Sequence, residues 1–495
     1  MRATLGAEFE AALTRHRDRV AVEAGGRRWT FAEVHRWARA VAAQLRERGV
    51  GAGDPVALYL GNGAAFVVAD VAVALLGAVK VPVNTLLPEA TVRYVVAAAR
   101  VRLAVVDPAL GVDLSSDVPV VLVDDLATEG GAGPAAARVG PDARAAIYFT
   151  GGTTGRPKGV VHTQASAVAL QYAQLLEAEI VADDRLLLTT PLAHAAGLLA
   201  QSALLRGATS VVEPGFDAAG VLDALRTRGI TWTFLVPTMI YRLLDLLDGP
   251  EPLGLRTVVY GAAPITPDRL ARGLQLLGPV FVQLYGQTEC PNWGTRLGRD
   301  DHDPARPDLL DSCGRASIMA DVAVVDDAGE PVGAGDTGEV CLRSPYVLAG
   351  YLDDPDATAA KFLPGGWIRT GDVGYLDEGG YLHLRDRRAD MVISGGMNVY
   401  CREVEDVLAG HPAVAQVAVI GRPHDDWGEA VHAVIVPAGA ADTGEILAWC
   451  RGRLAAYARP KSAELVDDLP LTPFGKVDKK ALRAPYWAGR GRAIG

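Results

Sequence analysis

The stretch YFTGGTTGRPKG, at positions 148–159, indicates the fold and the chemistry of this chain more clearly than any other. Its glycines leave backbone amides open to close approach by a phosphate, its threonine hydroxyls add hydrogen-bond donors, and its lysine adds positive charge. The apolar residues 145–149 predict a buried strand that presents this loop at its end. A Walker loop fits in no register, because Pro157 stands where that motif needs glycine or lysine. The residues expected to hold a nucleotide phosphate are Thr150, Gly151, Gly152, Thr153, Thr154, Gly155 and Lys158.

Length and composition exclude several classes of protein. The chain has 495 residues, which predicts roughly three domain-sized units with a large core. A hydrophobic content of 49% with 22% charged residues is typical of a soluble globular protein. The net charge of −11, without a basic run interleaved with aromatic residues, argues against nucleic-acid binding. The scattered cysteines indicate reduced thiols in a cytoplasmic protein rather than disulfides or a metal site; they are Cys290, Cys313, Cys341, Cys401 and Cys450.

The N-terminus and the most apolar stretch both argue against membrane insertion. The first residues, MRATLGAEFEAAL, are amphipathic and already carry acidic side chains, so we expect no signal peptide. The apolar residues 66–83 are interrupted by Asp70 and Lys80, and Gly77 with Pro82 predicts a buried helix that leads into a strand. We therefore expect no membrane partner.

The hydrophobic pattern predicts an α/β fold with largely parallel sheets. Thr30 and Glu33 form a capping box ahead of an amphipathic helix that Gly49 ends. Helices then alternate with short apolar strands, expected at 56–60, 103–106, 120–123, 210–213, 232–236 and 257–260. Residues 311–384 change to short strands with tight turns, which predicts a small β-rich barrel or sheet. After Asp390 the α/β pattern returns, with strands expected at 414–420 and 430–436 and a helix from Asp442, capped by Glu445.

This change of pattern places the domain boundary at residues 387–390. We expect a large N-terminal domain over residues 1–386 and a small C-terminal domain over residues 391–495. The large domain would hold nucleotide and substrate, and the residues between the two would form the connection.

Four further motifs carry side chains suited to a nucleotide, although each alone has an ordinary structural explanation. YGQTE at 285–289 follows an apolar strand and offers a ring, a hydroxyl and a carboxylate, which can stack on a base, hold a phosphate and bind Mg²⁺. TGD at 370–372 places a carboxylate in a tight turn, and Arg387 lies at the boundary. His194 stands among small residues at the start of a predicted helix, where a structural role is more common than a catalytic one. PLTPFGK at 470–476 is a rigid loop that holds one lysine, Lys476.

Taken together and in this order, these motifs resemble the adenylate-forming superfamily: acyl- and aryl-CoA synthetases, adenylation domains of peptide synthetases, and luciferases. The loop at 150–158 is similar to that family's phosphate loop, with Gly151 where serine is frequent. YGQTE is similar to the adenine and Mg²⁺ motif, and TGD to the ribose motif. Gly338-Glu339, Arg343-Ser344-Pro345 and Gly350-Tyr351 resemble the segment between them. DRRADMVISGGMNVYCREVE resembles the hinge and thiol-tunnel segment, and PLTPFGKVDKKAL the loop of the catalytic lysine.

The resemblance implies a two-step ligase that uses ATP and Mg²⁺. A carboxylate attacks the α-phosphate of ATP, pyrophosphate leaves, and a second nucleophile then displaces AMP from the acyl-adenylate. The resemblance implies that Lys476 bridges the carboxylate and the α-phosphate, that Thr288 contacts that phosphate and that Glu289 binds Mg²⁺. It places His194 among the catalytic residues and the ribose against Asp372 and Arg387. The adenine would lie on Gly261, Ala262, Ala263, Tyr285 and Gly286.

The resemblance also implies that the small domain rotates between the two half-reactions. Ser394, Gly395 and Gly396 would then reach a thiol tunnel, where the glycines leave room for pantetheine. Two positions depart from the family: Ala389 replaces the usual Asp or Lys of the hinge, and Cys401 stands where proline is usual. Loss of the side chain at 389 is expected to alter the balance between conformers without forbidding rotation.

Free coenzyme A is the preferred acceptor, because the chain ends without a fused carrier domain. A carrier protein, an amine, or activation of nitrite for diazotisation stay open as alternatives, as do a monomer and a homodimer. An amino-acid substrate is disfavoured, since residues 194–197 lack the aspartate that binds an amine in relatives. The acid is expected to be a small carboxylic acid, aryl or fatty, in a pocket lined by His194, Gly197, Trp232, Pro237, Met239, Gly261, Asn292 and Trp293.

Two other classes of function fit the sequence less well. A kinase-like phosphoryl transferase would release ADP, and the phosphate loop is not of the Walker type. A degenerate nucleotide-binding regulator would release nothing, and the intact Lys158, Glu289, Asp372 and Lys476 argue against it.

Overall fold

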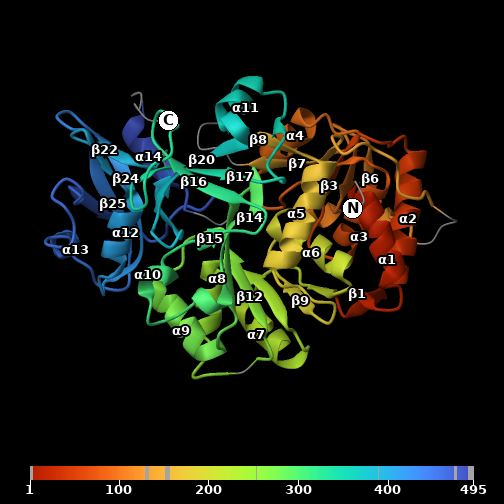
Figure 1. The fold of residues 1–495 in the computed structure, drawn as a ribbon, viewed down its shortest axis with the longest axis horizontal. Coiled ribbons are helices and arrows are strands. Elements are labelled where there is room, and N and C mark those ends of the chain that lie inside the picture. Colours follow the sequence, from red (N-terminus) through yellow and green to blue (C-terminus); the bar gives the residue numbers. More distant parts are fainter. Residues whose placement is uncertain are drawn as a thin grey trace.

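The computed structural model describes residues 4–128, 133–150, 157–251, 253–387, 390–472 and 477–488. Figure 1 shows the large N-terminal part from red to teal and the smaller C-terminal part in blue at one side. The fold is of the predicted α/β class, with two mixed, largely parallel sheets in the large part.

The first sheet has the strand order β15-β14-β13-β12-β11-β9-β10-β1-β2 among the described residues. Its central strands are parallel, and the pairs β1–β2, β13–β14 and β14–β15 are antiparallel. The strands are β1 (Val20–Ala24), β2 (Arg27–Thr30), β9 (Arg185–Leu188), β10 (Thr209–Val212), β11 (Trp232–Leu235), β12 (Thr257–Gly261), β13 (Phe281–Gln287), β14 (Cys290–Leu297) and β15 (Arg315–Ala316).

The second sheet has the order β18-β8-β7-β4-β3-β5-β6 in the described chain. Here too the core is parallel, and β8 joins antiparallel to β7 and to β18. The strands are β3 (Pro55–Tyr59), β4 (Val79–Pro82), β5 (Leu103–Val106), β6 (Val120–Leu122), β7 (Arg144–Thr150), β8 (Lys158–Thr163) and β18 (Gly350–Tyr351).

One apolar core joins the two sheets through the helices between them (Figure 1). These helices are α1 (Leu5–Arg15), α2 (Phe31–Glu47), α3 (Ala64–Leu75), α5 (Gln164–Glu177) and α6 (Ala195–Arg206). Helix α2 begins at the predicted capping box of Thr30 and Glu33, and α3 is buried on nearly all sides. Asp70 of α3 and Lys80 of β4 form a buried ion pair at 3.0 Å, which explains how this apolar stretch carries two charges. In the described part of the chain, no helix has the length and apolar character needed to cross a bilayer.

The outer faces of the two sheets are covered by further helices. Helices α7 (Ala218–Thr227), α8 (Pro237–Leu244) and α9 (Pro267–Leu277) cover the first sheet, and α4 (Glu89–Ala98) covers the second. Helix α10 (Pro307–Leu310) and 3₁₀ turns at Pro108–Leu110, Val123–Asp125, Arg299–Asp301 and Pro364–Gly366 complete the connections. Because the parallel strands end at one edge of each sheet, the loops that follow them gather there.

A third, antiparallel sheet corresponds to the region predicted as a small barrel or sheet. It runs β16-β17-β20-β19, with β21 also paired to β20, and is formed by β16 (Asp321–Val325), β17 (Gly338–Arg343), β19 (Phe362–Leu363), β20 (Trp367–Leu376) and β21 (Leu382–Arg387). Helix α11 (Pro355–Lys361) lies beside it, at the top of Figure 1. In the described strands the pairing does not close, so this region is an open sheet.

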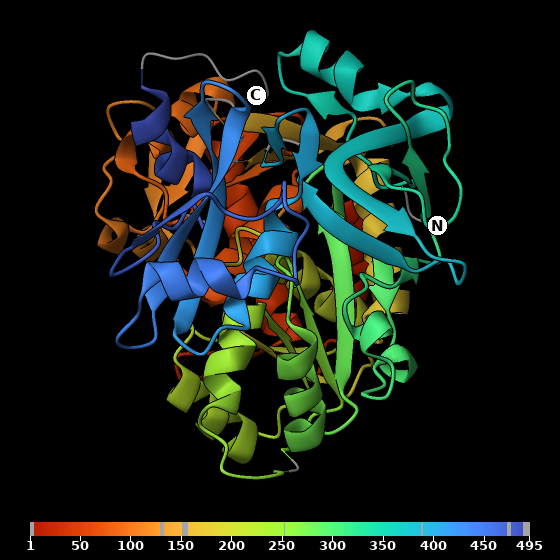
Figure 2. The ribbon, with the colours of Figure 1, turned by 90° about the vertical axis from the view of Figure 1, so that its left-hand side faces the viewer.

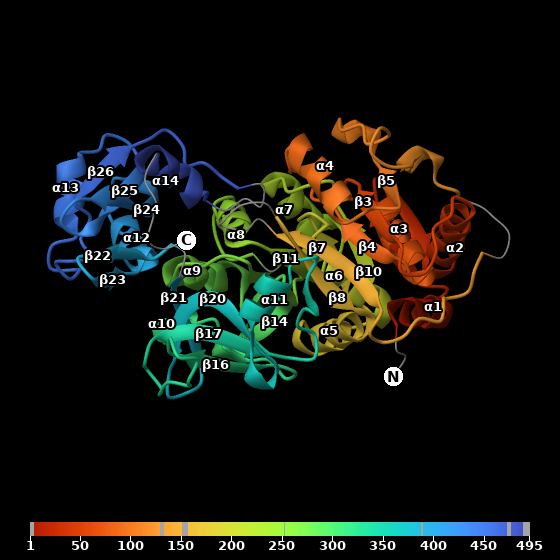
Figure 3. The same ribbon diagram turned by 90° about the horizontal axis from the view of Figure 1, so that it is seen from above.

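The C-terminal part forms its own sheet and core at one end of the molecule (Figures 2 and 3). The sheet runs β23-β22-β25-β24, with β26 on β25, and is formed by β22 (Val392–Ser394), β23 (Met397–Val399), β24 (Val414–His424), β25 (Gly428–Pro437) and β26 (Ser462–Leu465). Helices α12 (Cys401–Ala409), α13 (Thr443–Trp449) and α14 (Lys479–Trp487) pack against it. Helix α13 follows the N-cap residue Asp442, whose side chain accepts hydrogen bonds from the backbone amides of Gly444 and Glu445. The helix therefore starts where the sequence predicts, but its cap is Asp442 and not Glu445, which lies three residues later.

Candidate active site

The β13–β14 hairpin is the centre of the candidate site. Sequence patterns predict that YGQTE follows the strand, whereas β13 extends through Gln287 and only Thr288 and Glu289 form the connection to β14. The longer strand fixes the directions of Tyr285 and Gln287 on a paired backbone, and Glu289 lies in the two-residue connection that follows. The backbone carbonyl of Thr288 lies 2.9 Å from Nε2 of the buried His162, which holds the connection against β8.

The expected ribose carboxylate, Asp372, lies directly beside this hairpin. Its Oδ2 accepts from the Tyr285 hydroxyl at 2.6 Å and from Nε2 of Gln287 at 3.3 Å, and its Oδ1 lies 3.5 Å from Nε of Arg387. Burial and the neighbouring carboxylate raise the pKa of Tyr285 well above its ordinary value, so its hydroxyl stays a donor. The structure therefore brings Tyr285, the ring expected to contact adenine, together with Asp372 and Arg387, the side chains expected to hold the ribose.

The prediction that TGD forms a tight turn is wrong. Thr370, Gly371 and Asp372 lie in the middle of β20, at an irregularity in its pairing with β17. Gly371 has φ +79°, a conformation that glycine adopts without strain, and the bulge directs the Asp372 side chain toward β13. A bulge inside a strand and a turn between strands share the same local sequence signal.

Glu289, the expected magnesium ligand, is connected to two other side chains. Its Oε1 accepts from the Tyr351 hydroxyl at 2.6 Å and lies 3.8 Å from Nζ of Lys361. Lys361 also donates to Oε1 of Gln287 at 2.9 Å. We call Tyr285, Gln287, Glu289, Lys361 and Asp372 the nucleotide-side network.

The donor set of this network fits Mg²⁺. Among the described residues, no group of three or more histidines, cysteines or carboxylates is arranged to hold a metal ion. Mg²⁺ needs no such cage, because it is typically bound by one or two carboxylates together with substrate phosphates and waters. The single carboxylate of Glu289 at the hairpin connection supplies what such a site requires.

The phosphate loop lies between the ends of two paired strands. Thr150 ends β7 and pairs with Lys158 at the start of β8. Nζ of Lys158 lies 3.7 Å from Asp354 and 5.1 Å from the centre of the Tyr351 ring, so its charge is close to the partner of Glu289. Gly151, Gly152, Thr153, Thr154 and Gly155 lie outside the described residues, as do Lys476 and Ala389.

Two predicted site residues have left-handed backbone conformations. Ala262, which follows β12 and Gly261, has φ +67°, and Asn292 in β14 has φ +62°. Ala263 continues the same loop. Such conformations cost a non-glycine residue energy and are concentrated at functional sites, so they support a role for these segments.

His194 is the N-cap residue of α6, as its position at the start of a predicted helix indicates. Burial lowers the pKa of its imidazole to about 4, so the ring is neutral at physiological pH. Gly197 lies one turn later, where a Cβ would stand 2.0 Å from the carbonyl oxygen of Leu192. Glycine at this position therefore allows α6 to pack closely on the preceding segment.

Asn292 begins a second, uncharged network on the predicted acid side. Its amide donates to Oε1 of Gln174 at 2.6 Å, and Nε2 of Gln174 donates to the Leu198 carbonyl at 3.1 Å and to Ser202 at 3.0 Å. The hydroxyl of Ser202 donates to Oε1 of Gln171, and Nε2 of Gln171 donates to Oε1 of Gln201. We call Asn292, Gln174, Ser202, Gln171 and Gln201 the acid-side network; it ties the hairpin to α5 and α6.

The remaining predicted pocket residues differ in their positions. Pro237 opens α8 directly after β11, with Met239 in its first turn, and Trp293 is fully buried beside Asn292. Trp232 contradicts the prediction, because it lies at the start of β11, the end opposite to the loops of the site. Its indole is fully buried and donates to the Ala178 carbonyl at 2.9 Å, which makes it a core residue.

The glycines of the expected tunnel segment form a tight hairpin. Ser394 pairs with Met397, and Gly395 and Gly396 between them have φ +60° and +79°. Two consecutive positive φ values are typical of a two-residue turn that requires glycine, so this backbone explains both residues without a ligand. Cys401 is fully buried at the start of α12, and burial raises the pKa of its thiol well above the ordinary range.

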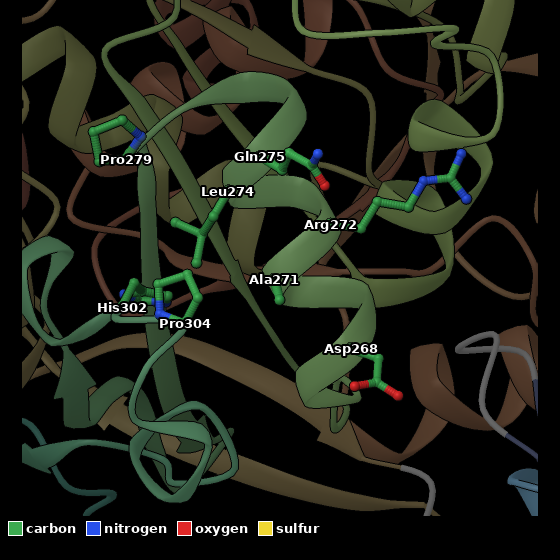
Figure 4. A pocket seen from close by; sticks show the side chains of 8 residues that line it. All are labelled: Asp268, Ala271, Arg272, Leu274, Gln275, Pro279, His302 and Pro304. Atoms are coloured by element: carbon green, nitrogen blue, oxygen red, sulfur yellow. The ribbon is translucent and has the colours of Figure 1, made fainter.

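A separate surface cavity of about 690 Å³ lies along α9 (Figure 4). Asp268, Arg272 and Gln275 line it together with Pro279, and it includes no predicted site residue. His302 at its edge is bonded to Tyr260 and to the Gly298 carbonyl, which gives this ring a structural role.

Sequence reasoning missed most of the side chains that complete the two networks and the contact of Tyr351 with Glu289. Lys361 ends a short helix and its position gives no signal, since a terminal lysine is usually solvated. Gln174 lies on α5 together with Gln171, and Ser202 lies on the neighbouring helix α6. Two glutamines on an apolar helix are a weak signal of a buried network. Tyr351 belongs to a recognised motif, yet its contact with Glu289 depends on β18 joining β8.

Comparisons with known proteins agree with this geometry. The sequence model described as AMP-binding enzyme matches residues 9–352, and the one described as AMP-binding enzyme C-terminal domain matches residues 403–476. The chain is 45% identical over 371 residues to the medium/long-chain-fatty-acid–CoA ligase FadD8 of Mycobacterium tuberculosis, an alignment that covers 73% of this chain and 64% of the relative. It is 38% identical to a feruloyl-CoA synthase of Amycolatopsis, over 94% of this chain and 96% of the relative.

Among solved structures, the amide bond synthetase McbA from Marinactinospora thermotolerans superposes with a TM-score of 0.87. The two share 35% identity over 97% of this chain and 99% of McbA. A family model that spans most of the chain, and a relative aligned over nearly its whole length, leave one assignment. The chain is a member of the AMP-binding enzyme family, within the adenylate-forming superfamily.

Proposed function

We propose that this protein activates a small carboxylic acid with ATP and transfers the acyl group to coenzyme A. In the first half-reaction a carboxylate oxygen attacks the α-phosphorus of ATP and pyrophosphate leaves. In the second the thiol sulfur attacks the acyl carbon, AMP leaves, and the thiol proton passes to solvent. The observation that carries this proposal is the nucleotide-side network. Its direct contacts connect Asp372, the carboxylate expected to hold the ribose, with Glu289, the carboxylate expected to bind the metal.

The first half-reaction joins two anions, so the protein has to neutralise and position them rather than supply a nucleophile. Asp372 and Arg387 would hold the ribose, Tyr285 and the 261–263 segment the adenine, and Thr288 the α-phosphate. Mg²⁺ on Glu289 would offset charge on the phosphates when bound. The amide-rich loop with Lys158 would surround the departing pyrophosphate, and Lys476 would bridge the carboxylate and the α-phosphate.

The second half-reaction would use the C-terminal part as a movable domain. We place the hinge at residues 387–390, between a large domain over 1–386 and a small one over 391–495. Rotation would withdraw Lys476 and bring the hairpin at Ser394–Gly396 to the thiol. The separate core of this part is what such a motion requires.

Coenzyme A is the proposed acceptor because two similar relatives are named as CoA-thioester-forming enzymes. Their names refer to medium/long-chain fatty acids and to a feruloyl group, so the proposal extends to fatty and aryl carboxylic acids and no further. A second candidate is transfer to an amine, which the likeness to an amide bond synthetase over nearly the whole chain favours.

A panel of aryl and fatty acids tests both candidates. Each acid is incubated with ATP and Mg²⁺, and pyrophosphate and AMP are measured with coenzyme A, with an amine, and with neither. Thioester detected by mass spectrometry only in the coenzyme A arm supports the proposal, and amide in the amine arm supports the alternative. Release of ADP, or no acid-dependent pyrophosphate with any acid, would refute adenylation.

A further inference from the structure

Lys361 is a largely buried cation that the roles proposed above do not use. Its side chain is 12% exposed, although the helix it ends, α11, lies at the surface. A lysine at a helix end can place its ammonium in water on its four-carbon stem at little cost. Burial of the charge is stable only where partners compensate for the lost hydration, so the partners of Lys361 indicate what holds it there.

These partners are two side chains of the YGQTE motif. The ammonium donates to Oε1 of Gln287 at 2.9 Å and lies 3.8 Å from Oε1 of Glu289, whose side chain is also 12% exposed. Burial lowers the pKa of Lys361, while the nearby Glu289 and Asp372 act to raise it. The ammonium therefore lies beside the carboxylate expected to bind Mg²⁺ and is connected through Gln287 to the carboxylate expected to bind ribose.

The contact with Gln287 fixes the orientation of that amide. An ammonium can only donate, so it requires the carbonyl oxygen of Gln287 on its side. The amide nitrogen then faces the other way, where it donates to the Thr370 carbonyl at 3.0 Å and to Oδ2 of Asp372 at 3.3 Å. With the Tyr285 hydroxyl on the same oxygen, Oδ2 is fully engaged and Oδ1 is the atom turned toward Arg387.

We propose that Lys361 is a positioning residue of the adenylation site, which acts through Gln287 to orient Asp372 for the ribose and through Glu289 to hold the metal carboxylate in register with it. The inference rests on the proposed function, because it assigns Asp372 and Glu289 the roles given there. No substrate contact is assigned to Lys361 itself.

Binding of AMP without metal tests the Gln287 arm alone. By calorimetry, Lys361→Met should weaken AMP binding about tenfold, the effect expected when a hydrogen bond to a charged group is lost. Lys361→Arg, which keeps charge and donors, should remain within about threefold of the wild type. Gln287→Leu should weaken AMP binding similarly, and the double variant should be no weaker than Gln287→Leu alone, because both changes remove one linkage.

Lys80→Met is the control, since Lys80 also forms a lysine–carboxylate pair, with Asp70, and it otherwise contacts Tyr148 of β7, which is not among the residues expected to bind the nucleotide. It should lower the unfolding midpoint and leave the AMP affinity unchanged. If Lys361→Met does not fold, Lys361→Leu, which also removes the donor, replaces it. Unchanged AMP affinity in folded Lys361→Met or in the variant that replaces it, or additive losses in the double variant, would overturn the inference. Failure of the wild type to bind AMP or ATP would refute the proposed function and this inference with it.

Discussion

Two polar networks start from the β13–β14 hairpin, and one contains charged side chains whereas the other is uncharged. The nucleotide-side network, around Tyr285, Glu289 and Asp372, consists of carboxylates, a phenol, one amide and a largely buried ammonium. The acid-side network starts only three residues beyond Glu289, at Asn292, and consists of amides and a hydroxyl that satisfy one another. It meets charge only at its far end, where Gln201 donates to Asp70.

This difference matches what each side is proposed to bind. Charges held close together at partial burial are costly unless opposite charges compensate them, so the carboxylates of the nucleotide side suit a metal cation and the nearby ammonium groups suit phosphates. Mutually satisfied amides cost little and fix the helices that carry them. We infer that the acid side is built to define a shape and that the nucleotide side is built to stabilise charge.

The largest effect is expected on the charged side, at Lys476. Lys476→Ala should reduce acid-dependent pyrophosphate release by about 100-fold or more, the range seen when one group that stabilises developing charge is removed. Thioester formation from a supplied acyl-adenylate and coenzyme A should be largely retained. Both half-reactions are measured on one preparation, and equal loss of the two would show that Lys476 is not specific to adenylation.

A smaller effect is expected on the uncharged side, at Asn292. Asn292→Ala leaves Oε1 of Gln174 buried without this donor, which costs about 1–3 kcal/mol, so KM for the acid should rise about tenfold while KM for ATP stays unchanged. Asn292→Gly is the matched variant, because it removes the same amide but accepts the φ of +62°. Steady-state kinetics with each substrate varied measure the split.

The two Asn292 variants also distinguish the effect of losing the side-chain amide from the effect of backbone strain. Alanine should lower the unfolding midpoint more than glycine, since only alanine adds strain at this φ. A rise in KM for ATP that equals the rise for the acid would contradict the division of the hairpin into two sides.

The smallest effect concerns protonation of His194 on the uncharged side. Burial lowers its pKa to about 4 from an ordinary value near 6.5. The unfolded chain therefore takes up this proton below about pH 6.5 and the folded chain only below about pH 4, so stability falls as the pH decreases through this window and is independent of this group above it.

Denaturant unfolding at pH 8, 7, 6 and 5 measures this dependence in the wild type and in His194→Gln. The variant should lose part of the decrease between pH 6.5 and pH 5 and show the same slope as the wild type above pH 7. Identical profiles for the two proteins across the whole range would show that His194 titrates normally.

Much of the fold could be predicted because its signals are local. The strand at 103–106 coincides with β5, and the capping box of Thr30 and Glu33 opens α2, since apolar runs and caps are read within a few residues. The motifs that mark the phosphate loop, YGQTE and TGD are equally short. Local signals did not reveal that TGD interrupts a strand, because a bulge and a turn need the same glycine.

The candidate pocket was harder to predict, because an apolar residue that is expected to be buried can lie at either end of its strand. Trp232 and Pro237 lie only five positions apart, yet the first begins β11 in the core and the second follows it at the site. Lys361 and Gln287 are 74 positions apart in sequence and in direct contact.

The amino-acid sequence by itself determined the class of fold, the order of the motifs and the chemical groups available for ATP and an acid. Those properties depend on residue type, on spacing and on short-range hydrogen bonding. Only the tertiary structure decided that Lys361 lies beside Glu289 and Gln287, that Asn292 connects to Gln174 and that Trp232 belongs to the core. These contacts arise where separate strands and helices meet, and the position of each element is set by the packing of all the others.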